Sequence, residues 1–542
     1  MARVAAPEVV LIGYQDQGNL GMGYLAAVLK EQGRTVELID VRDGPQRIAA
    51  RLAPTTAAAQ PLVVGFSLIF QFFLPQFRRV ATELRRAGVT SHFTMGGHYA
   101  SLCHDELLAQ MPELDSVARY EGEHTLVELA DRLAAGTDWR PTPGLAFLSD
   151  GKVTESPTRP LIQDLDSLPF PYRPYEPERI VGFPTVPLLA SRGCARRCSF
   201  CSIHTFYRTA PGKTVRVRKA STVIEEMLLL HREQGARVFL FQDDDFPLWG
   251  RAGRKWVDEL AERMHGTGLA ERVIWKISCR AEYVEPELFT KLRDAGLFLV
   301  YMGIESGVEA GLQILHKQLT VEQNLTGVQT LKDVGLHFMY GFMLFDPSST
   351  FDSVRGNIGF LRQIVGDGSS AATFCRMLPY GGTPIRDRLK LEGRLRGDVS
   401  RPDYDFLDPR LTDYYRQLKP VSGQWVSDEG ISHELHWAWD EFTTVERLVP
   451  GLTGGQEYRR ALAALTAECN EALFRLVEDS ATAFEHGERS LLDPAAARAT
   501  CEGVRTRLLE LRNGYFLGNV EALTEAVRLN AIRGPVLAPQ VH

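Results

Sequence analysis

Residues 191–201 read SRGCARRCSFC and place Cys194, Cys198 and Cys201 in a C-x3-C-x2-C pattern. Three thiolates this close together on one loop can each bind one iron of a cubane 4Fe–4S cluster. The fourth iron is then open to a small molecule that chelates through an amine and a carboxylate. The chain has 8 cysteines, and the other five are widely separated, so we assign none of those five to a metal.

A zinc site is the alternative interpretation of these thiols. Zinc closes its tetrahedral shell with a fourth Cys or His, which usually comes from a second paired knuckle. His204 is near enough in sequence to supply that ligand, but the chain contains no second C-x2-C. The pattern therefore favours a three-cysteine cluster.

Short apolar runs alternate with helical patterns around and after the cysteines. Thr222 and Glu225 predict a capping box that opens a helix over 222–234. Consecutive β–α units predict parallel strands in a partial (β/α)6 TIM-like barrel, whose functional side chains follow the strand ends. We expect its strands at 188–191, 238–242, 274–278, 299–303, 338–344 and 372–378.

The rest of the chain divides by pattern into α/β, proline-rich and helical parts. The first part alternates strands and helices, which predicts a doubly wound, Rossmann-like sheet. Prolines crowd the second part and predict an ordered but irregular linker. Strands are expected to stop near residue 390, with helices over 455–485 and 494–530. The predicted domains are 1–140, the linker 141–187, the barrel 188–390 and a mainly helical domain 391–542.

Composition limits the partners and the location. A net charge of −7 over 542 residues gives no reason to expect a nucleic-acid or membrane-surface binder. The N-terminus lacks a signal-peptide pattern, and no apolar stretch is long enough to span a bilayer. A reducing cytoplasm is therefore the expected location, where clustered thiols indicate a metal or catalysis.

The cysteine spacing, with an aromatic residue before the last cysteine, resembles the signature of the radical S-adenosylmethionine superfamily. The resemblance implies that Cys194, Cys198 and Cys201 hold the cluster and that S-adenosylmethionine caps its open iron. The bound molecule is then cleaved to a 5′-deoxyadenosyl radical, with electrons from an external flavodoxin- or ferredoxin-type reductant. The residues implied at the S-adenosylmethionine site are Phe200, Asp243, Asp244, Arg280, Glu305 and Ser306.

Alternatives stay open at two of these positions. The run Asp243–Asp245 also fits a solvated acidic turn, because three adjacent carboxylates are costly to bury without a positive partner. Arg280 also fits an ion pair with Glu282. The fifth barrel strand departs from the family pattern, because it ends in Phe345-Asp346-Pro347 where relatives commonly have Gly-Phe/Leu-Pro.

The N-terminal sheet offers two cofactor interpretations. The stretch Gly21-Met-Gly23-Tyr-Leu-Ala26 fits the dinucleotide pattern G-x-G-x-x-A, and Asp40 ends the next strand. That fingerprint requires a tight turn directly after the first strand, whereas Tyr14 to Leu20 intervene here. Such an enlarged loop suits a bulky planar ligand better than a pyrophosphate.

The order of the predicted domains resembles the cobalamin-binding branch of the superfamily, over roughly residues 5–385. In Asp16-Gln-Gly18-Asn-Leu-Gly21, a glycine stands where some cobalamin proteins have a cobalt-binding histidine, which implies base-off cobalamin without a histidine ligand. His98 could replace that ligand, but a hydrogen bond to the corrin or its tail is favoured. The residues implied at the cobalamin site are Gln17, Gly18, Leu20, Gly21, Ser67, Leu68, Gly96, Gly97, His98, Glu121 and Gly122.

These implications favour an oxygen-sensitive C-methyltransferase that acts on an unactivated carbon of a small molecule or biosynthetic intermediate. One S-adenosylmethionine would methylate cobalt, and a second would give the radical that activates the substrate for methyl transfer from methylcobalamin. Cyclisation, ring contraction or another rearrangement with the same cofactors is the alternative, followed by a non-catalytic sensor. The aromatic residues Trp425, Trp437, Trp439, Phe442 and Tyr458 either line a substrate pocket or, more commonly, form a helical core.

Overall fold

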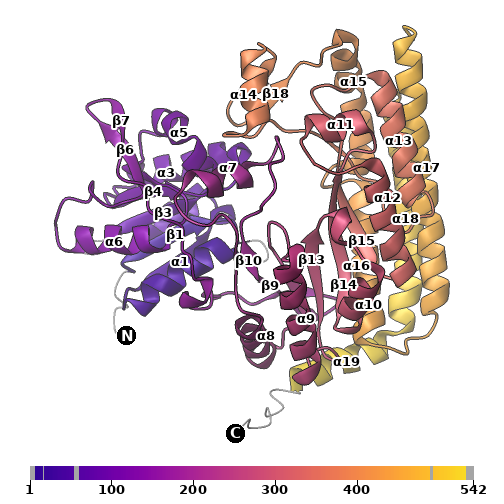
Figure 1. Ribbon diagram of the computed structural model, residues 1–542, viewed down its shortest axis with the longest axis horizontal. Coiled ribbons are helices and arrows are strands. Elements are labelled where there is room, and N and C mark those ends of the chain that lie inside the picture. The colour runs from indigo at the N-terminus through magenta and orange to yellow at the C-terminus, as the bar shows by residue number, and fades with distance from the viewer. Residues whose placement is uncertain (1–6, 16–17, 54–59, 489–491, 533–542) are drawn as a thin grey trace. The chain divides into compact units, whose positions relative to one another are not determined.

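The computed structural model describes residues 7–15, 18–53, 60–488 and 492–532 (Figure 1). The chain forms two compact units, each built from segments that are not contiguous in sequence. The first unit comprises residues 1–176, 191–218 and 378–403. The second comprises residues 177–190, 219–377 and 404–542. The cysteine segment therefore packs with the N-terminal sheet.

A seven-stranded sheet forms the first unit, in the order β2-β1-β3-β4-β5-β6-β7. Its first five strands are parallel, as the sequence predicts. Their bounds are β1 Val9–Gly13, β2 Val36–Asp40, β3 Val63–Ser67, β4 His92–Gly96 and β5 Ser116–Ala118.

Helices cover both faces of this sheet, which explains why its strands are apolar throughout. Val9 and Leu11 of β1 pack with α1 (Leu20–Glu31) and α6 (Glu123–Ala134). The alternate residues Val10 and Ile12 pack with α2 (Pro45–Leu52) and α3 (Leu74–Arg86). Side chains that alternate along a strand thus fill two separate cores.

The remaining two strands are a hairpin in the stretch that was predicted to be an irregular linker. Strand β6 (Leu145–Ser149) pairs antiparallel with β5 and with β7 (Lys152–Glu155). Asp150 and Gly151 form the two-residue turn with φ of 52° and 73°. Positive φ at both positions matches the type I′ turn that joins tight hairpins. The prediction of an irregular linker is wrong over these residues. It gave more weight to the nearby prolines than to the Asp-Gly sequence, which is typical of a tight hairpin turn.

The second unit contains an open half-barrel in the order β16-β15-β14-β13-β12-β9-β8. Strand β8 (Glu178–Ile180) is antiparallel to β9, and the other six strands run parallel. The parallel strands are β9 Phe183–Leu188, β12 Val238–Phe241, β13 Ile274–Cys279, β14 Leu297–Glu305, β15 His337–Phe345 and β16 Cys375–Arg376.

Two boundaries in this barrel differ from the prediction. The first strand is β9, which precedes the expected 188–191 and contains Pro184 and Pro187. Proline lacks a donor but keeps its acceptor, and the carbonyl of Pro184 accepts a hydrogen bond from the Arg237 amide at 3.0 Å. The expected capping box at Thr222 is also absent, because α8 (Ala220–Gln234) begins two residues earlier, and its N-cap residue makes no side-chain cap hydrogen bond.

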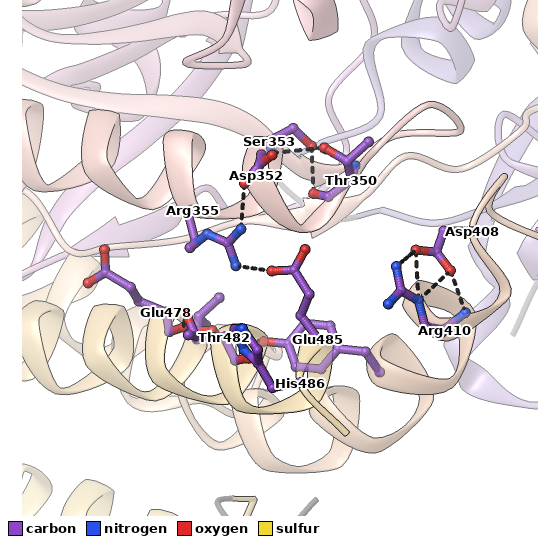
Figure 2. Close-up of polar contacts among 12 residues, drawn as sticks. Thr350, Asp352, Ser353, Arg355, Asp408, Arg410, Glu478, Thr482, Glu485 and His486 are labelled. Carbon is purple, nitrogen blue, oxygen red and sulfur yellow. Dashed lines mark hydrogen bonds and ion pairs between the residues drawn. The ribbon is translucent and has the colours of Figure 1, made fainter. Parts of the chain in front are cut away.

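Helices on the outer face of the half-barrel alternate with its strands (Figure 1). Capping boxes open two of them. One is formed by Thr320 and Gln323, and the other, shown in Figure 2, by Thr350 and Ser353. The barrel helices after α8 are α9 Gly250–Gly266, α10 Pro286–Asp294, α11 Glu309–Ile314, α12 Val321–Val334 and α13 Phe351–Val365.

The helices after residue 403 pack as part of the second unit, and the helix over 384–391 belongs to the first unit. Helix α17 lies against α13, and Arg355 of α13 forms an ion pair with Glu485 of α17 at 2.8 Å (Figure 2). Strands do not stop at residue 390, because β17 (Leu395–Gly397) and β18 (Pro402–Tyr404) form a short ribbon. The helices are α14 Pro384–Leu391, α15 Pro409–Val426, α16 Ile431–Leu448, α17 Gly455–Glu485, α18 Pro494–Gly518 and α19 Val520–Ile532.

None of the helices in the described ranges combines the length and the apolar composition that crossing a bilayer requires.

Candidate functional site

Three cysteine side chains, those of Cys194, Cys198 and Cys201, lie on the loop between β10 (Ser191–Arg192) and α7 (Ser202–Thr209). The amide of Arg196 donates a hydrogen bond to Cys194 Sγ at 3.4 Å, and the amide of Cys201 donates to the Cys198 carbonyl at 3.3 Å. A backbone N–H on the sulfur stabilises the thiolate, which is the form that ligates iron. The thiols and their backbone donors therefore fit an iron–sulfur cluster. Phe200, expected beside the adenine, is half-buried on the same loop.

His204, the fourth ligand in the zinc interpretation, lies in α7. Its Nε2 atom is buried without a hydrogen-bond partner, and burial lowers the pKa of the ring. In the described part of the chain, no three His, Cys, Asp or Glu side chains are arranged around a single-ion site.

A buried ion-pair network ties the cysteine segment to the N-terminal sheet. Arg192 pairs with Glu123 at 2.7 Å and with Glu121 at 3.1 Å, and Arg216 pairs with Glu121 at 2.8 Å. Burial opposes the charged form of Arg192, but Glu123 and Glu121 outweigh it and raise the pKa of this guanidinium. Glu121, which was expected to contact cobalamin, also accepts the Ile162 amide at 2.7 Å. Its carboxylate therefore joins the cysteine segment to the N-terminal segment of the first unit.

The loop after β1 carries the first group of predicted cobalamin residues. Gln17 lies outside the described residues. Gly18 has a φ of 73°, a conformation that favours glycine. Leu20 begins α1 and Gly21 is exposed in its first turn. The sequence interpretation missed Asn19, the N-cap residue whose side chain accepts the Met22 amide at 3.0 Å. Asparagine before a helical pattern is the signal that could have identified it.

The loops after β3 and β4 approach each other closely. Gly97 has a φ of 111°, and a Cβ atom there would lie 2.2 Å from the Leu68 carbonyl oxygen. Only glycine fits at this position. The amide of Leu68 donates to the Gly96 carbonyl at 2.8 Å, and its side chain lies in the hydrophobic core. Leu68 can therefore offer a ligand little more than its backbone, whereas Ser67 at the end of β3 is half-buried.

His98 begins the short helix α4 (His98–Leu102), next to these glycines. Its ring centre lies 4.4 Å from that of Phe206, and its Nε2 atom is buried without a hydrogen-bond partner. Burial lowers the pKa of His98 to about 4, so the ring is neutral near pH 7. A neutral imidazole with an unsatisfied buried nitrogen fits a polar group of a buried ligand.

The fourth loop, between β5 and α6, completes the same sheet edge. Tyr120 has a φ of 64°, which is uncommon for a residue other than glycine, and Gly122 is the N-cap of α6. All four loops follow the carboxyl ends of parallel strands, where ligands of doubly wound folds bind.

Exposed apolar side chains at this edge were not predicted. Ile69, Phe70 and Phe72 follow β3 and are 39–41% exposed. The rings of Phe70 and Phe72 stack with their centres 5.4 Å apart. An exposed aromatic surface beside glycine-lined loops suits a large planar ligand such as a corrin. The apolar run from residue 69 to 73 was the available signal, but its composition alone is equally typical of a buried segment.

The predicted S-adenosylmethionine residues of the second unit follow the barrel strands. Asp243 is buried and accepts the Ala190 amide at 3.2 Å, whereas Asp244 is exposed. The solvated acidic turn therefore describes Asp244 but not Asp243. Arg280 forms the alternative ion pair with Glu282 at 2.7 Å and also donates to the Lys317 carbonyl at 2.6 Å.

The end of β14 holds the other two predicted residues. Glu305 has a φ of 68° and pairs with Lys317 at 3.0 Å. Holding a non-glycine residue in this region costs energy, which the ion pair can offset. Ser306 is fully buried and donates to Asn357 Oδ1 at 3.2 Å, so its hydroxyl shapes the turn after the strand. The contacts of these residues with S-adenosylmethionine stay predictions.

Comparisons with known proteins identify the family of two parts of the chain. Residues 188–360 match the Radical SAM superfamily, and residues 9–130 match the B12 binding domain. The uncharacterized methyltransferase PH0819 of Pyrococcus horikoshii is 30% identical over 369 residues, which cover 68% of this chain and 77% of that protein. The chain belongs to the cobalamin-dependent radical S-adenosylmethionine family.

A second relative and a solved structure extend the comparison. The anaerobic magnesium-protoporphyrin IX monomethyl ester cyclase of Rubrivivax gelatinosus is 27% identical over 328 residues, covering 58% of this chain and 56% of the cyclase. The structure of the cobalamin-dependent radical enzyme OxsB, with aqua-cobalamin and S-adenosylmethionine bound, has the same fold. Its TM-score is 0.65 at 17% identity, and the match covers 97% of this chain and 84% of OxsB.

The C-terminal aromatic residues of this family member are mainly core. Trp425, Trp439, Phe442 and Tyr458 are buried, and Trp437 is exposed. Trp439 stacks on His337, and both line a cavity of about 200 Å³ at the amino-terminal ends of β14 and β15. Functional residues of parallel barrels lie at the opposite strand ends.

Proposed function

We propose that this enzyme transfers a methyl group to an unactivated carbon of a small molecule. One observation carries the proposal: the cysteine loop and the B12-binding sheet belong to one compact unit, joined by the ion pairs of Arg192. A cluster and a corrin held by the same rigid unit suit a reaction that needs both. The similarity to a protein described as a methyltransferase also supports methyl transfer.

The residue roles in this proposal follow the motifs. The bound cofactors supply the substrate radical and the methyl group, while the protein binds, orients and excludes water. Cys194, Cys198 and Cys201 would hold the cluster, and the glycine-lined loops with His98 would hold base-off cobalamin. We also propose a cytoplasmic location and a flavodoxin- or ferredoxin-type reductant. The domain division 1–140, 141–187, 188–390 and 391–542 likewise stays a proposal.

Methyl-labelled S-adenosylmethionine tests the proposal directly. The protein is reconstituted without oxygen with iron, sulfide and cobalamin, reduced, and incubated with small-molecule extracts. The expected result is a product that carries the label, together with S-adenosylhomocysteine and 5′-deoxyadenosine. Deoxyadenosine without any labelled product would contradict methyl transfer. Replacing Cys198 by Ala is expected to abolish deoxyadenosine formation while cobalamin absorbance is retained.

Cyclisation or rearrangement with the same cofactors is the second candidate. The similarity to a cyclase favours it, although this chain spans only 56% of that protein. An unlabelled product that forms only with the complete enzyme would select this candidate. Failure to cleave S-adenosylmethionine under anaerobic reduction would instead favour the non-catalytic sensor.

A further inference from the structure

The inner face of the half-barrel carries a cluster of polar side chains at its middle level. Trp275 and Ile277 of β13 are fully buried, so the alternate residues Lys276 and Ser278 occupy its other face. Lys276 Nζ donates to Ser278 Oγ at 3.0 Å and lies 5.6 Å from the ring centre of Tyr301 on β14. Tyr301 is 37% exposed, which is unusual for a ring in a barrel interior.

Two glycines keep this face open. Gly303 and Gly341 are neighbours in the β14–β15 register. A Cβ atom on Gly341 would lie 2.8 Å from the Tyr301 hydroxyl, and one on Gly303 would lie 2.9 Å from Glu305 Oε1. Polar groups therefore occupy the space that larger side chains would fill. The inner face is built as a polar surface instead of a packed core.

A carboxylate from the C-terminal region joins this cluster. Helix α16 lies against β13 and β14, and it carries Asp440. Asp440 Oδ1 is buried, and it has no hydrogen-bond partner among the residues that the structure describes. Burial raises the pKa of Asp440 to about 7, although Lys276 acts in the opposite direction. Burial likewise lowers the pKa of Lys276, against the influence of Asp243 and Asp440.

Lys276 on β13 and Asp440 on α16 belong to elements that are in contact, and no ion pair joins these two side chains in the part of the chain that the structure describes. Lysine has three donors, and Lys276 uses one of them on Ser278. Because the two side chains do not pair with each other, the Lys276 ammonium can still donate, and the Asp440 carboxylate can still accept, a hydrogen bond with a third group. A purely structural pair would be expected to close, because separation leaves both charges poorly compensated.

We propose that Lys276 and Asp440 together bind one polar group of the substrate, which presents an oxygen acceptor to Lys276 and an N–H donor to Asp440. A carboxamide and an α-amino acid both offer this combination. Tyr301, beside Lys276, would border the same group. The inference rests on the proposed function, because that function requires a substrate to enter the barrel. It adds the chemical class of that substrate and two residues that select it.

Retention of small molecules by the holoenzyme tests the proposal. The protein, loaded with cluster, cobalamin and S-adenosylmethionine, is mixed with a metabolite extract, filtered without oxygen and analysed by mass spectrometry. Lys276→Met, Lys276→Gln and Asp440→Asn are compared with Lys291→Met and Asp258→Asn, which alter an exposed ion pair of 2.7 Å on α10 and α9. The wild type and both controls are expected to retain a metabolite with an N–H donor beside an oxygen acceptor.

Retention should fall by about tenfold or more in the Lys276 and Asp440 variants. Asp440→Glu should recover part of it, and the structure of the metabolite distinguishes an amide from an amino acid. Equal retention by all variants overturns the proposal. Deoxyadenosine formation without substrate should stay within about twofold, and its loss would assign these residues to the S-adenosylmethionine site instead. A retained metabolite that never gains labelled methyl would refute the methyltransferase function but not this site.

Discussion

Arg192 illustrates how a single residue can hold two segments together. Arg192→Met would leave Glu123 without its guanidinium partner and Glu121 with Arg216 alone, in a buried setting. Removing one member of a buried ion pair costs about 3–5 kcal/mol. We expect a clearly lower melting temperature and a lower iron content after reconstitution. The measurements are thermal unfolding and iron analysis.

Arg86→Met is the matched control for this change. Arg86 pairs with Glu83 on the exposed surface of α3 at 2.6 Å, where solvent screens the charges and ion pairs contribute little to stability. Similar melting temperatures for both variants would contradict a structural role for the buried network.

Asp440 gives a stability difference that depends on pH. Its pKa is raised from the ordinary value of 3.8 to about 7, chiefly by burial, with Lys276 opposing and Glu441 adding to the shift. Between pH 4 and 7 the folded state therefore binds a proton that the unfolded state releases, so the carboxyl destabilises the fold most above pH 7. Asp440→Asn should melt higher than the wild type at pH 8, with a smaller difference at pH 5. A difference that grows toward pH 5 would contradict this assignment.

Sequence patterns identified residues only where chemistry fixes the spacing. The three cysteines could be predicted because one cluster demands them on one loop. The ion pair of Arg280 with Glu282 was one of two interpretations that the sequence left open, because the two residues are close in sequence. The ion pair of Glu121 with Arg192 depends on a distant segment that the motif does not name. Lys276 and Asp440 lie 164 positions apart (440 − 276), and no local pattern connects them.

At the scale of the elements, Asn470 of helix α17 is one side chain through which this helix supports the barrel. Asn470 is buried, and its Nδ2 donates to the carbonyls of Val365 and Ser370 at 2.8 and 3.0 Å. Its Oδ1 accepts the Ala372 amide at 2.7 Å. The Val365 carbonyl would keep a hydrogen bond from the Gly368 amide at 3.0 Å. Within the described residues, Asn470→Leu would leave the Ser370 carbonyl and the Ala372 amide unsatisfied, which we expect to cost about 2–4 kcal/mol. Chemical denaturation of the second unit measures this loss.

Thr482→Ala on the same helix is the control. Its hydroxyl donates to the Glu478 carbonyl on the exposed side of α17, so its removal should change stability by less than about 0.5 kcal/mol (Figure 2). If Asn470→Leu is equally mild, the loop before β16 does not depend on α17.

Elements with strong periodicity could be predicted, and those set by turns or distant partners could not. The parallel strands of the first sheet and helix 455–485 agree with the predictions because their burial repeats along the chain. The β6–β7 hairpin depends on a two-residue turn, and β9 depends on pairing with β12, 50 residues away. Thr222 and Glu225 have the spacing of a capping box, but the helix begins at Ala220. A capping box requires the Thr to be the N-cap residue, and the point at which the chain enters the helix determines which residue that is.

At the scale of the whole molecule, the first unit is assembled from three separated segments. This division could not be predicted, because the segment 191–218 lies between barrel strands in the sequence. Its side chains complete a hydrophobic cluster with the N-terminal part: Tyr120 and Leu161 pack with Phe206, Tyr207 and Ala210. The N-terminal domain is therefore incomplete without the cysteine segment.

A fragment of residues 1–176 should show this incompleteness. It would expose Tyr120 and Leu161 and leave Glu121 and Glu123 without the arginines of the later segment. Exposed apolar surface and unpaired acids lower stability, so we expect strong binding of an apolar dye and rapid proteolysis. The full chain is the control. A fragment that resists protease as the full chain does would mean that the B12-binding sheet folds alone, and that the cysteine loop is only attached to it. The buried arginines argue for the first outcome, since their partners in the sheet are carboxylates that few other groups could satisfy.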